Sequence, residues 1–273
     1  MFTYDFIRYL CKKLDTPRNL EMHRFKTTGV DYITNITYGE QLKSALTALF
    51  TCTSIKFKDD AVVISLSTRG YRLSFFKQFV NMLNRELQYE EKVVKGQGQK
   101  MIFPIDVFAH LFYYTGINDL KTRGFLYKHY NVINFIEKAN EFGQFSKCVR
   151  AKMGAILVKD GEIKYSARNG HPVKTRLDHV CDRKGVVSGT EFQRGICMHA
   201  EWNLICKASK KDLEGGTVYI NAPPCTVCTR MLIQTGVNLV IFREEGYSLD
   251  GVKLAYRLNG KTKFFGVKYG KVI

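Results

Sequence analysis

Hydrophobic and polar positions alternate with two different periods in the second half of the chain. Short runs rich in β-branched residues predict five strands, at residues 153–158, 162–167, 217–221, 238–242 and 263–267. Longer runs with apolar residues three and four positions apart predict four helices, at residues 131–145, 199–209, 225–234 and 249–258. The Asp160-Gly161 pair predicts a tight hairpin between the first two strands. This order, αββαβαβαβ, is typical of a three-layer α/β domain.

The first half of the chain shows a less regular pattern. Helical spacing predicts helices at residues 4–14, 41–50, 71–87 and 105–114. A hairpin is predicted over residues 54–67, and two more strands are expected around the Gly96-Gln97-Gly98 turn. Residues 40–116 then form an αββαββα unit, followed by a charged, turn-rich stretch at 117–128 that we interpret as a linker. We therefore expect a smaller basic α+β domain over residues 1–125 and the α/β domain over residues 126–273.

The composition of the chain indicates a folded protein of the cell interior. It has 273 residues, of which 45% are hydrophobic and five are proline, enough apolar side chains for packed cores. No apolar stretch reaches the roughly 18 residues of a membrane span, and the N-terminus lacks the pattern of a secretion signal. We therefore expect a cytoplasmic, reducing location and no membrane partner, in which the eight cysteines act as metal ligands or free thiols rather than disulfides.

The chain is strongly basic, with a formal net charge of +17 that is spread over both halves. Such a field attracts polyanions and phosphorylated small molecules and speeds their encounter with the protein. Charge alone does not decide between these partners, and a surface that merely keeps the protein soluble is the simpler alternative.

Two short motifs carry the candidate chemistry. The first contains His199 and Glu201, separated by one alanine, and the second is a Pro-Cys-x-x-Cys motif with Cys225 and Cys228. The pattern H-x-E…P-C-x-x-C is the signature of zinc deaminases. One imidazole and two thiolates suit tetrahedral zinc and leave its fourth position open for water. A structural zinc is the alternative, but such a site requires four protein ligands.

These residue types predict a hydrolytic mechanism. Zinc lowers the pKa of its bound water to about 7, and the resulting hydroxide attacks the amidine carbon of the base. Glu201 is expected to be the proton shuttle, which accepts the proton of the water, protonates the ring nitrogen and assists the loss of ammonia. The Cys-x-x-Cys pair at a helix start places both sulfurs on one turn, where the helix N-terminus favours thiolates.

The second half also resembles the deoxycytidylate (dCMP) deaminase family of the cytidine deaminase-like superfamily, over about residues 145–270. The resemblance rests on five motifs in order: Ser146-Lys147-Cys148-Val149-Arg150 before residues 153–161, Asn169-Gly170-His171-Pro172, Cys181-Asp182-Arg183, Ser188-Gly189, and His199-Ala200-Glu201-Trp202-Asn203. It implies a cytidine deaminase-like domain that binds zinc and converts a cytosine nucleotide of the dCMP type into the dUMP type.

The resemblance also implies roles for individual residues. Asn169 is expected to contact the sugar, and Lys210 stands where the family can place a phosphate-binding arginine. Because a lysine does not reproduce the planar fork of arginine, a solvated helix end is an equal alternative for Lys210. Trp202 is expected to be either a wall of the substrate pocket or part of the core.

A second zinc site is a further expectation from the resemblance, since some members of the family hold a structural zinc in this region. The candidate ligands are His179, Cys181 and Cys197. One ligand is missing from the sequence neighbourhood, so free thiols are the alternative.

Three functions remain to be compared. The first is an enzyme acting on free nucleotides, in which residues 1–125 serve regulation, partner binding or assembly into a homo-oligomer. The second is a polynucleotide deaminase whose first domain binds tRNA, another RNA or single-stranded DNA. In support of the second, residues 40–116 faintly resemble a LAGLIDADG-type unit, although no carboxylate stands at residues 49–53, where that family binds metal. The third is an inactive scaffold, which the complete set of ligands and acid argues against.

Overall fold

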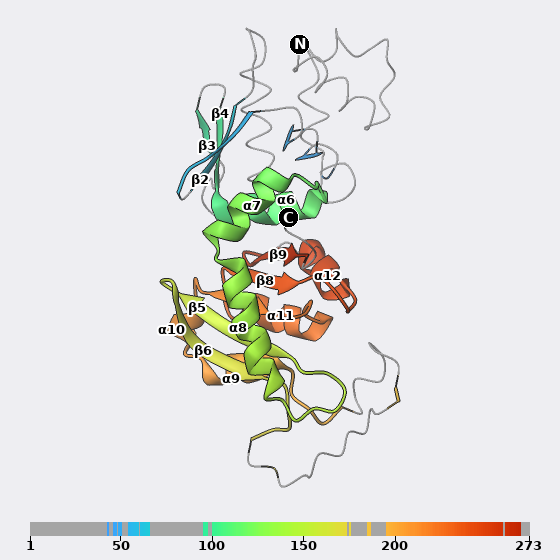
Figure 1. Cartoon of the computed structure of the whole chain (residues 1–273). Coiled ribbons are helices and arrows are strands. Elements are labelled where there is room, and N and C mark those ends of the chain that lie inside the picture. Colours follow the sequence, from blue (N-terminus) through green and yellow to red (C-terminus); the bar gives the residue numbers. More distant parts are fainter. Residues whose placement is uncertain are drawn as a thin grey trace. The chain divides into compact units, whose positions relative to one another are not determined.

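The computed structural model describes residues 43, 46–47, 49–50, 54–59, 61–65, 95–97, 100–173, 175, 185–186, 195–258 and 260–268. The chain divides into two compact units, Met1–Phe125 and Leu126–Ile273 (Figure 1). No helix among the described residues is both long and apolar enough to cross a membrane.

The described part of the first unit contains a four-stranded antiparallel sheet and helix α6, and residues 43, 46–47 and 49–50 are helical, within the helix predicted at 41–50. The strands have the order β1-β2-β4-β3, and helix α6 follows β4 directly. The bounds are β1 Ser54–Phe57, β2 Ala61–Ser65, β3 Lys95–Gln97, β4 Lys100–Pro104 and α6 Ile105–Thr115. The rings of Phe50, Phe103 and Phe108 are buried and contact one another, with centroids 5.1–6.3 Å apart. The predicted hairpins and the helix at 105–114 are therefore present, whereas the helices predicted at 4–14 and 71–87 lie outside the described residues.

The stretch 117–128, predicted as a turn-rich linker, contains the boundary between the two units, but most of it is helical and forms α7 (Leu120–His129). Asp119 begins the helix: its carboxylate accepts a hydrogen bond from the backbone N–H of Thr122 at 2.8 Å, and its carbonyl accepts one from Arg123 at 3.0 Å. An aspartate in this position satisfies backbone donors that are otherwise free in the first turn. The hydrophobic pattern does not predict this helix, because its apolar residues are few and stand among charged ones.

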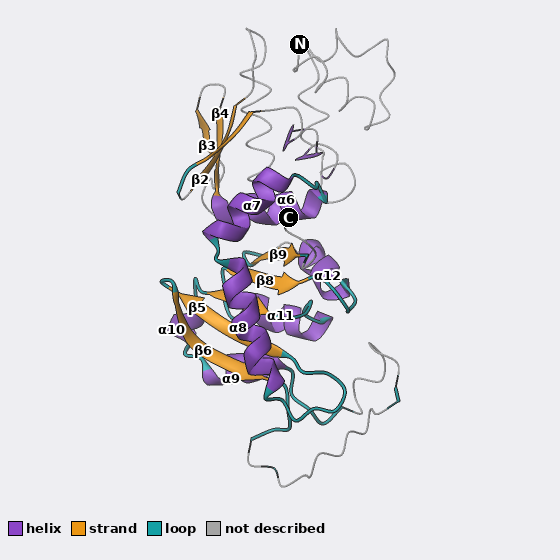
Figure 2. Cartoon of the chain, in the orientation of Figure 1, coloured by secondary structure: helices purple, strands orange, loops and turns teal. Residues whose placement is uncertain are grey.

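The second unit is built on a five-stranded mixed sheet with the order β6-β5-β7-β8-β9 (Figure 2). Strand β5 pairs antiparallel with β6 and β7, and β7, β8 and β9 run parallel. The elements are α8 Val132–Gln144, β5 Gly154–Lys159, β6 Glu162–Arg168, α9 Ala200–Lys207, α10 Lys210–Leu213, β7 Thr217–Ile220, α11 Thr226–Gln234, β8 Leu239–Arg243, α12 Asp250–Leu258 and β9 Lys263–Val267. The predicted α/β order is confirmed, with the four-residue helix α10 as an addition.

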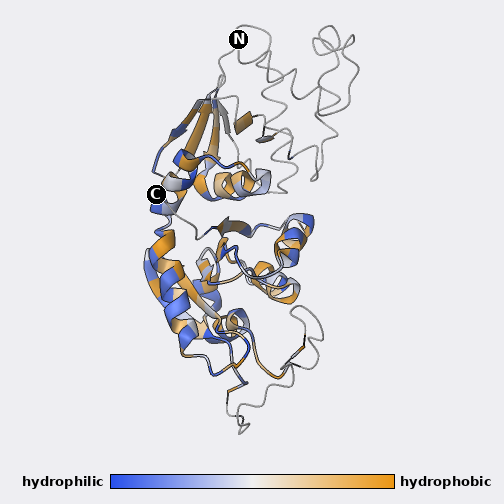
Figure 3. Cartoon of the chain, turned by 45° about the vertical axis from the view of Figure 1, so that its right-hand side comes forward, coloured by the Kyte–Doolittle hydropathy of each residue, from blue (hydrophilic) through white to orange (hydrophobic). Residues whose placement is uncertain are grey.

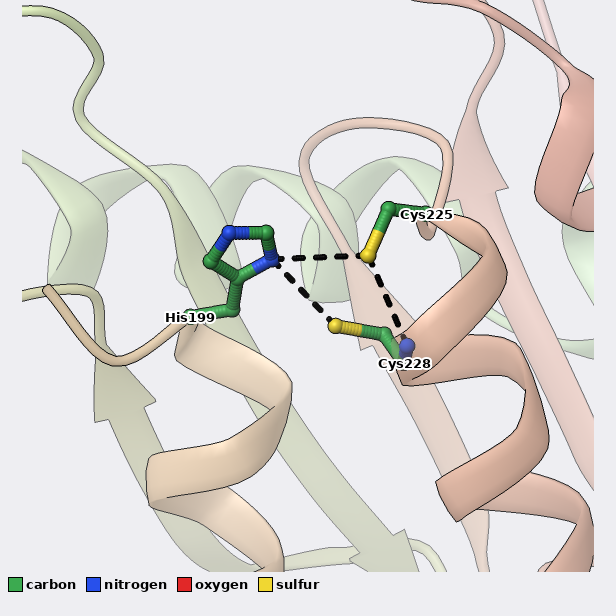
Figure 4. A group of neighbouring side chains, drawn as sticks. All are labelled: His199, Cys225 and Cys228. Atoms are coloured by element: carbon green, nitrogen blue, oxygen red, sulfur yellow. Dashed lines mark hydrogen bonds between the residues drawn. The ribbon is translucent and has the colours of Figure 1, made fainter. Parts of the chain in front are cut away.

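Helices cover both faces of this sheet. Helix α8 lies on one face (Figure 1), and α9 and α11 lie on the other (Figure 4). Hydrophobic residues concentrate on the strands between them, while α8 alternates between hydrophilic and hydrophobic positions (Figure 3). Gly154 of β5 permits the close approach of α8, since an added Cβ would overlap the carbonyl oxygen of Ala139. The three-layer architecture expected for this half of the chain is therefore confirmed.

The parallel strands bring the chemistry-bearing segments to one edge of the sheet. The carboxyl end of β7 leads through Pro223 and Pro224, both buried, into α11. Gly251 at the start of α12 packs against this connection, because an added Cβ there would overlap the carbonyl oxygen of Pro224. Ligand sites in open α/β sheets commonly form at the carboxyl ends of strands.

Candidate active site

The structure brings His199, Cys225 and Cys228 together (Figure 4). The Nδ1 atom of His199 lies 3.6 Å from Sγ of Cys225 and 3.3 Å from Sγ of Cys228. All three potential ligand atoms lie within 4.8 Å of one another. Among the described residues, this is the group of histidine, cysteine and acidic side chains that could hold a metal ion.

Two helix starts position these three side chains. His199 is the N-cap of α9, and Cys225 is the N-cap of α11. The Sγ atom of Cys225 accepts a hydrogen bond from the backbone N–H of Cys228 at 3.5 Å, as a capping side chain does. The Cys-x-x-Cys spacing therefore places both sulfurs on the first turn of α11, as the sequence predicted.

The donor set fits zinc. Zinc bonds of about 2.3 Å to sulfur and about 2.1 Å to nitrogen, at tetrahedral angles, hold these atoms roughly 3.6 Å apart. The observed separations of 3.3 and 3.6 Å from His199 to the two sulfurs agree with this value. Since three protein ligands leave one position for a water or substrate, the group has the composition of a catalytic site.

The two thiols are coupled to each other. A hydrogen bond from the thiol of Cys228, with a further contribution from His199, lowers the pKa of Cys225 to about 4. The same hydrogen bond, together with burial, raises the pKa of Cys228. The Cys225 sulfur therefore ionises more readily than that of Cys228, and a cation bound here favours ionisation of both sulfurs.

Glu201 lies in the first turn of α9 beside the three ligand candidates. Its side chain is buried, with 5% of the residue exposed. Burial raises the pKa of Glu201, and this effect is partly offset by the positive charge of His199 and by a hydrogen bond with Cys228. A buried carboxyl whose pKa is raised is suited to accept and return a proton.

Trp202, the only tryptophan of the chain, packs against the imidazole of His199. The two rings are stacked, with centroids 5.7 Å apart and planes inclined by 30°. The sequence left open whether Trp202 is a pocket wall or a core residue. In the structure its indole ring stacks on the imidazole of His199, a candidate metal ligand.

Asn169 is buried and braces the backbone that leads to the site. Its side-chain carbonyl accepts a hydrogen bond from the N–H of Met153 at 3.0 Å, and its amide donates one to the carbonyl of Ala151 at 2.8 Å. The next residue, Gly170, forms a β-bridge with Met198, which immediately precedes His199. Asn169 thus connects the loop before β5 to the segment that carries the histidine, and its expected contact with the sugar stays a prediction.

Replacing Asn169 by aspartate is expected to lower the free energy of unfolding by about 2 kcal/mol, because an oxygen then faces the carbonyl of Ala151 and that partly buried hydrogen bond is lost. Denaturant unfolding followed by fluorescence of the single tryptophan measures the change. Asn203→Asp is the matched control. Its amide also donates to a backbone carbonyl, that of Arg168 at 2.8 Å, but on the exposed side, where water replaces the lost partner. Equal free energies of unfolding for the two variants would contradict the stabilising role of the Asn169 side chain.

Asn221 also stabilises the backbone near the site through hydrogen bonds, a role that the sequence does not predict. Asn221, which follows β7, accepts a hydrogen bond from the N–H of Gly154 at 3.0 Å and donates to the carbonyl of Lys152 at 3.0 Å. Its amide also donates to the side chain of Asn140 in α8 at 3.2 Å. These contacts join the end of β7, just before Pro223, to the start of β5. Nothing in the local pattern predicts pairings between residues so far apart in the chain.

The structure does not bring Lys210 to the ligand group. It follows the carboxyl end of α9, whereas His199 precedes the same helix, whose eight residues span about 12 Å. The Lys210 side chain is 87% exposed, and its ammonium lies 3.6 Å from the carboxylate of Glu214. These observations favour the solvated helix end, and the phosphate role stays a prediction.

The candidate second zinc site is only partly described. His179 and Cys181 lie outside the described residues, while Cys197 is half-buried. The second zinc therefore stays a prediction.

Comparison with known proteins agrees with this geometry. A family model described as the cytidine and deoxycytidylate deaminase zinc-binding region matches residues 130–244. The chain is 30% identical over 118 residues to a deoxycytidylate deaminase of Mycobacterium phage D29, covering 41% of this chain and 92% of that protein. It is 28% identical over 136 residues to a deoxycytidylate deaminase of Mus musculus, covering 48% of this chain and 76% of that protein.

Among solved structures, a dCMP deaminase from the cyanophage S-TIM5, in complex with dCMP and dUMP, is 28% identical and has a TM-score of 0.41. The match covers 49% of this chain and 95% of that protein. The zinc-binding family model contains all three clustered ligand candidates and Glu201 within its matched range. The chain therefore belongs to the deoxycytidylate deaminase family of the cytidine deaminase-like superfamily.

Proposed function

We propose that the protein hydrolyses the 4-amino group of dCMP, giving dUMP and ammonia, at a zinc ion held by His199, Cys225 and Cys228. The observation that carries this proposal is the convergence of the three ligand atoms within 4.8 Å, beside a buried glutamate. The relatives support dCMP as the substrate, since they are named deoxycytidylate deaminases.

Zinc, when bound, acts as a Lewis acid that activates water for attack on the base. Side chains of the protein carry out the remaining steps. The carboxylate of Glu201 takes the proton released by the water and delivers it to N3 of the cytosine ring. The same carboxyl then transfers the second proton of the water to the departing amino group, so that ammonia leaves and the carbonyl of uracil forms. Burial of Glu201 keeps this proton transfer away from bulk water.

The unit Met1–Phe125 requires a separate account, because the family model matches only residues 130–244. We propose that this unit binds a partner of the enzyme, with nucleic acid, another protein and a second copy of the chain as the candidates. The net charge of +17, which is spread over both halves, favours an anionic partner for the chain as a whole. Deamination of a polynucleotide remains the second candidate function on this ground alone.

A substrate panel tests the proposal. The purified full chain is incubated with dCMP, dCTP, cytidine-containing tRNA and single-stranded DNA, and uracil formation is followed for each. We expect turnover of dCMP, at a rate that the polymers do not approach. Turnover on a polymer alone would overturn the assignment and make the second candidate function the correct one. Binding of labelled polynucleotide at low salt, measured in parallel, tests the partner of the first unit.

A further inference from the structure

The orientation of the His199 ring needs a restraint that the backbone does not supply. His199 is an N-cap residue with φ −69° and ψ 157°, and its side chain makes no capping hydrogen bond. Rotation about the Cβ–Cγ bond of histidine is broad and roughly two-fold, so this torsion does not select one ring orientation by itself. Only an orientation with Nδ1 toward α11 gives the distances of 3.3 and 3.6 Å to the two sulfurs.

Trp202 supplies a flat surface on which this ring rests. It stands three positions after His199, so both side chains lie on one side of the first turn of α9. The stacked geometry, 5.7 Å between centroids and 30° between planes, restricts rotation of the imidazole, since a turned ring would lose contact with the indole face.

The indole nitrogen indicates that Trp202 contributes its ring face, rather than a hydrogen bond, to the surroundings of His199. Its Nε1 atom is buried and has no hydrogen-bond partner within the described ranges of the chain. A buried donor without a partner is a cost that an aliphatic core residue avoids. The buried residues of α9 are Ala200, Glu201 and Leu204, whereas Trp202 as a whole is half-buried. An aromatic plane beside the imidazole accounts for a tryptophan here, and a plain packing role does not.

We propose that Trp202 is a positioning residue for His199, which holds the imidazole so that Nδ1 faces the metal position, and thereby strengthens zinc binding. This proposal rests on the proposed zinc site. Residues that orient a metal ligand typically change metal affinity by about 10–100-fold when they are replaced.

Two substitutions distinguish the effect of an aromatic plane from the effect of side-chain volume. Trp202→Phe keeps a ring beside His199, and Trp202→Met keeps an apolar side chain of adaptable shape without a plane. The full-length variants are loaded with zinc, and affinity is measured by competition with a chromophoric chelator. We expect Trp202→Met to bind zinc at least about tenfold more weakly than the parent chain, and Trp202→Phe to stay within about threefold.

Cobalt substitution gives a measurement that a change in protein stability alone does not alter. The visible absorption of Co²⁺ depends on ligand geometry, so we expect a changed spectrum in Trp202→Met and a nearly unchanged one in Trp202→Phe. Ile205→Ala, which removes a half-buried side chain from the same helix, is the control and is expected to leave both affinity and spectrum unchanged. Should Trp202→Met not fold, Trp202→Leu takes its place, and the thermal midpoint of each chelator-treated variant reports folding.

The possible failures are distinct. If the parent chain binds no stoichiometric zinc, the proposed zinc site itself is wrong. If the parent binds zinc and Trp202→Met matches it in affinity and cobalt spectrum, the site stands and the positioning role is wrong. The same holds if Ile205→Ala weakens zinc binding as much as Trp202→Met does.

Discussion

Replacing Glu201 by glutamine is expected to lower kcat for dCMP by about 10³-fold while zinc stays bound. Positioned acids and bases contribute about 10²–10⁴-fold to rate, and Glu201 serves at more than one proton transfer in the proposed reaction. Glutamine keeps the size of the buried side chain but cannot accept a proton and return it. Ammonia release under saturating dCMP gives kcat, and elemental analysis of the same samples gives the zinc content.

A matched control separates this effect from a general loss of charge. Glu214→Gln removes a carboxylate that is more than half exposed and pairs with Lys210 on the surface. Such exposed pairs contribute about 0–1 kcal/mol to stability, so kcat is expected to stay within about twofold of the parent. If Glu201→Gln retained full activity with zinc bound, the proton shuttle would have to be assigned to another group.

Much of the second unit could be predicted because its signals are local. The strand at 263–267 was predicted with the observed bounds, and the hairpin at Asp160-Gly161 forms with positive φ at both residues, 54° and 76°. Asp160-Gly161 is a sequence pair that favours this backbone conformation. The Cys-x-x-Cys motif likewise fixes two sulfurs by helix geometry alone, so Cys225 and Cys228 could be placed before any tertiary contact was known.

What the sequence did not reveal depends on contacts between distant segments. Asn169 and Asn221 act as braces through backbone groups 16 to 69 positions away along the chain, and no periodicity reports such pairings. The stacking of Trp202 on His199 is close in sequence, but the spacing alone does not show that the histidine ring turns toward α11. Lys210 was compared with a family position, whereas the structure places it past the far end of α9.

Replacing Cys228 by alanine is expected to weaken zinc binding by more than about 100-fold and to abolish deamination at low free zinc. Changes in the groups that merely orient a ligand cost about 10–100-fold in affinity, so removal of a ligand atom costs more. Cys228 is fully buried in the first turn of α11, and its sulfur lies 3.3 Å from Nδ1 of His199. Chelator competition measures affinity, and dCMP turnover is measured at a buffered zinc concentration.

Thermal unfolding makes the loss of zinc visible without any activity measurement. A ligand that binds only the folded state stabilises it by about 4 kcal/mol at a thousandfold excess over its Kd, so zinc is expected to raise the Tm of the parent chain. The Tm of Cys228→Ala is expected to be independent of zinc in the same range. Cys206→Ala is the control, because it removes an exposed free thiol from α9 and leaves the ligand group complete. A zinc-dependent Tm in Cys228→Ala equal to that of the parent would mean that the ion is held elsewhere, and the convergence of imidazole and thiols in Figure 4 would then need a purely structural explanation.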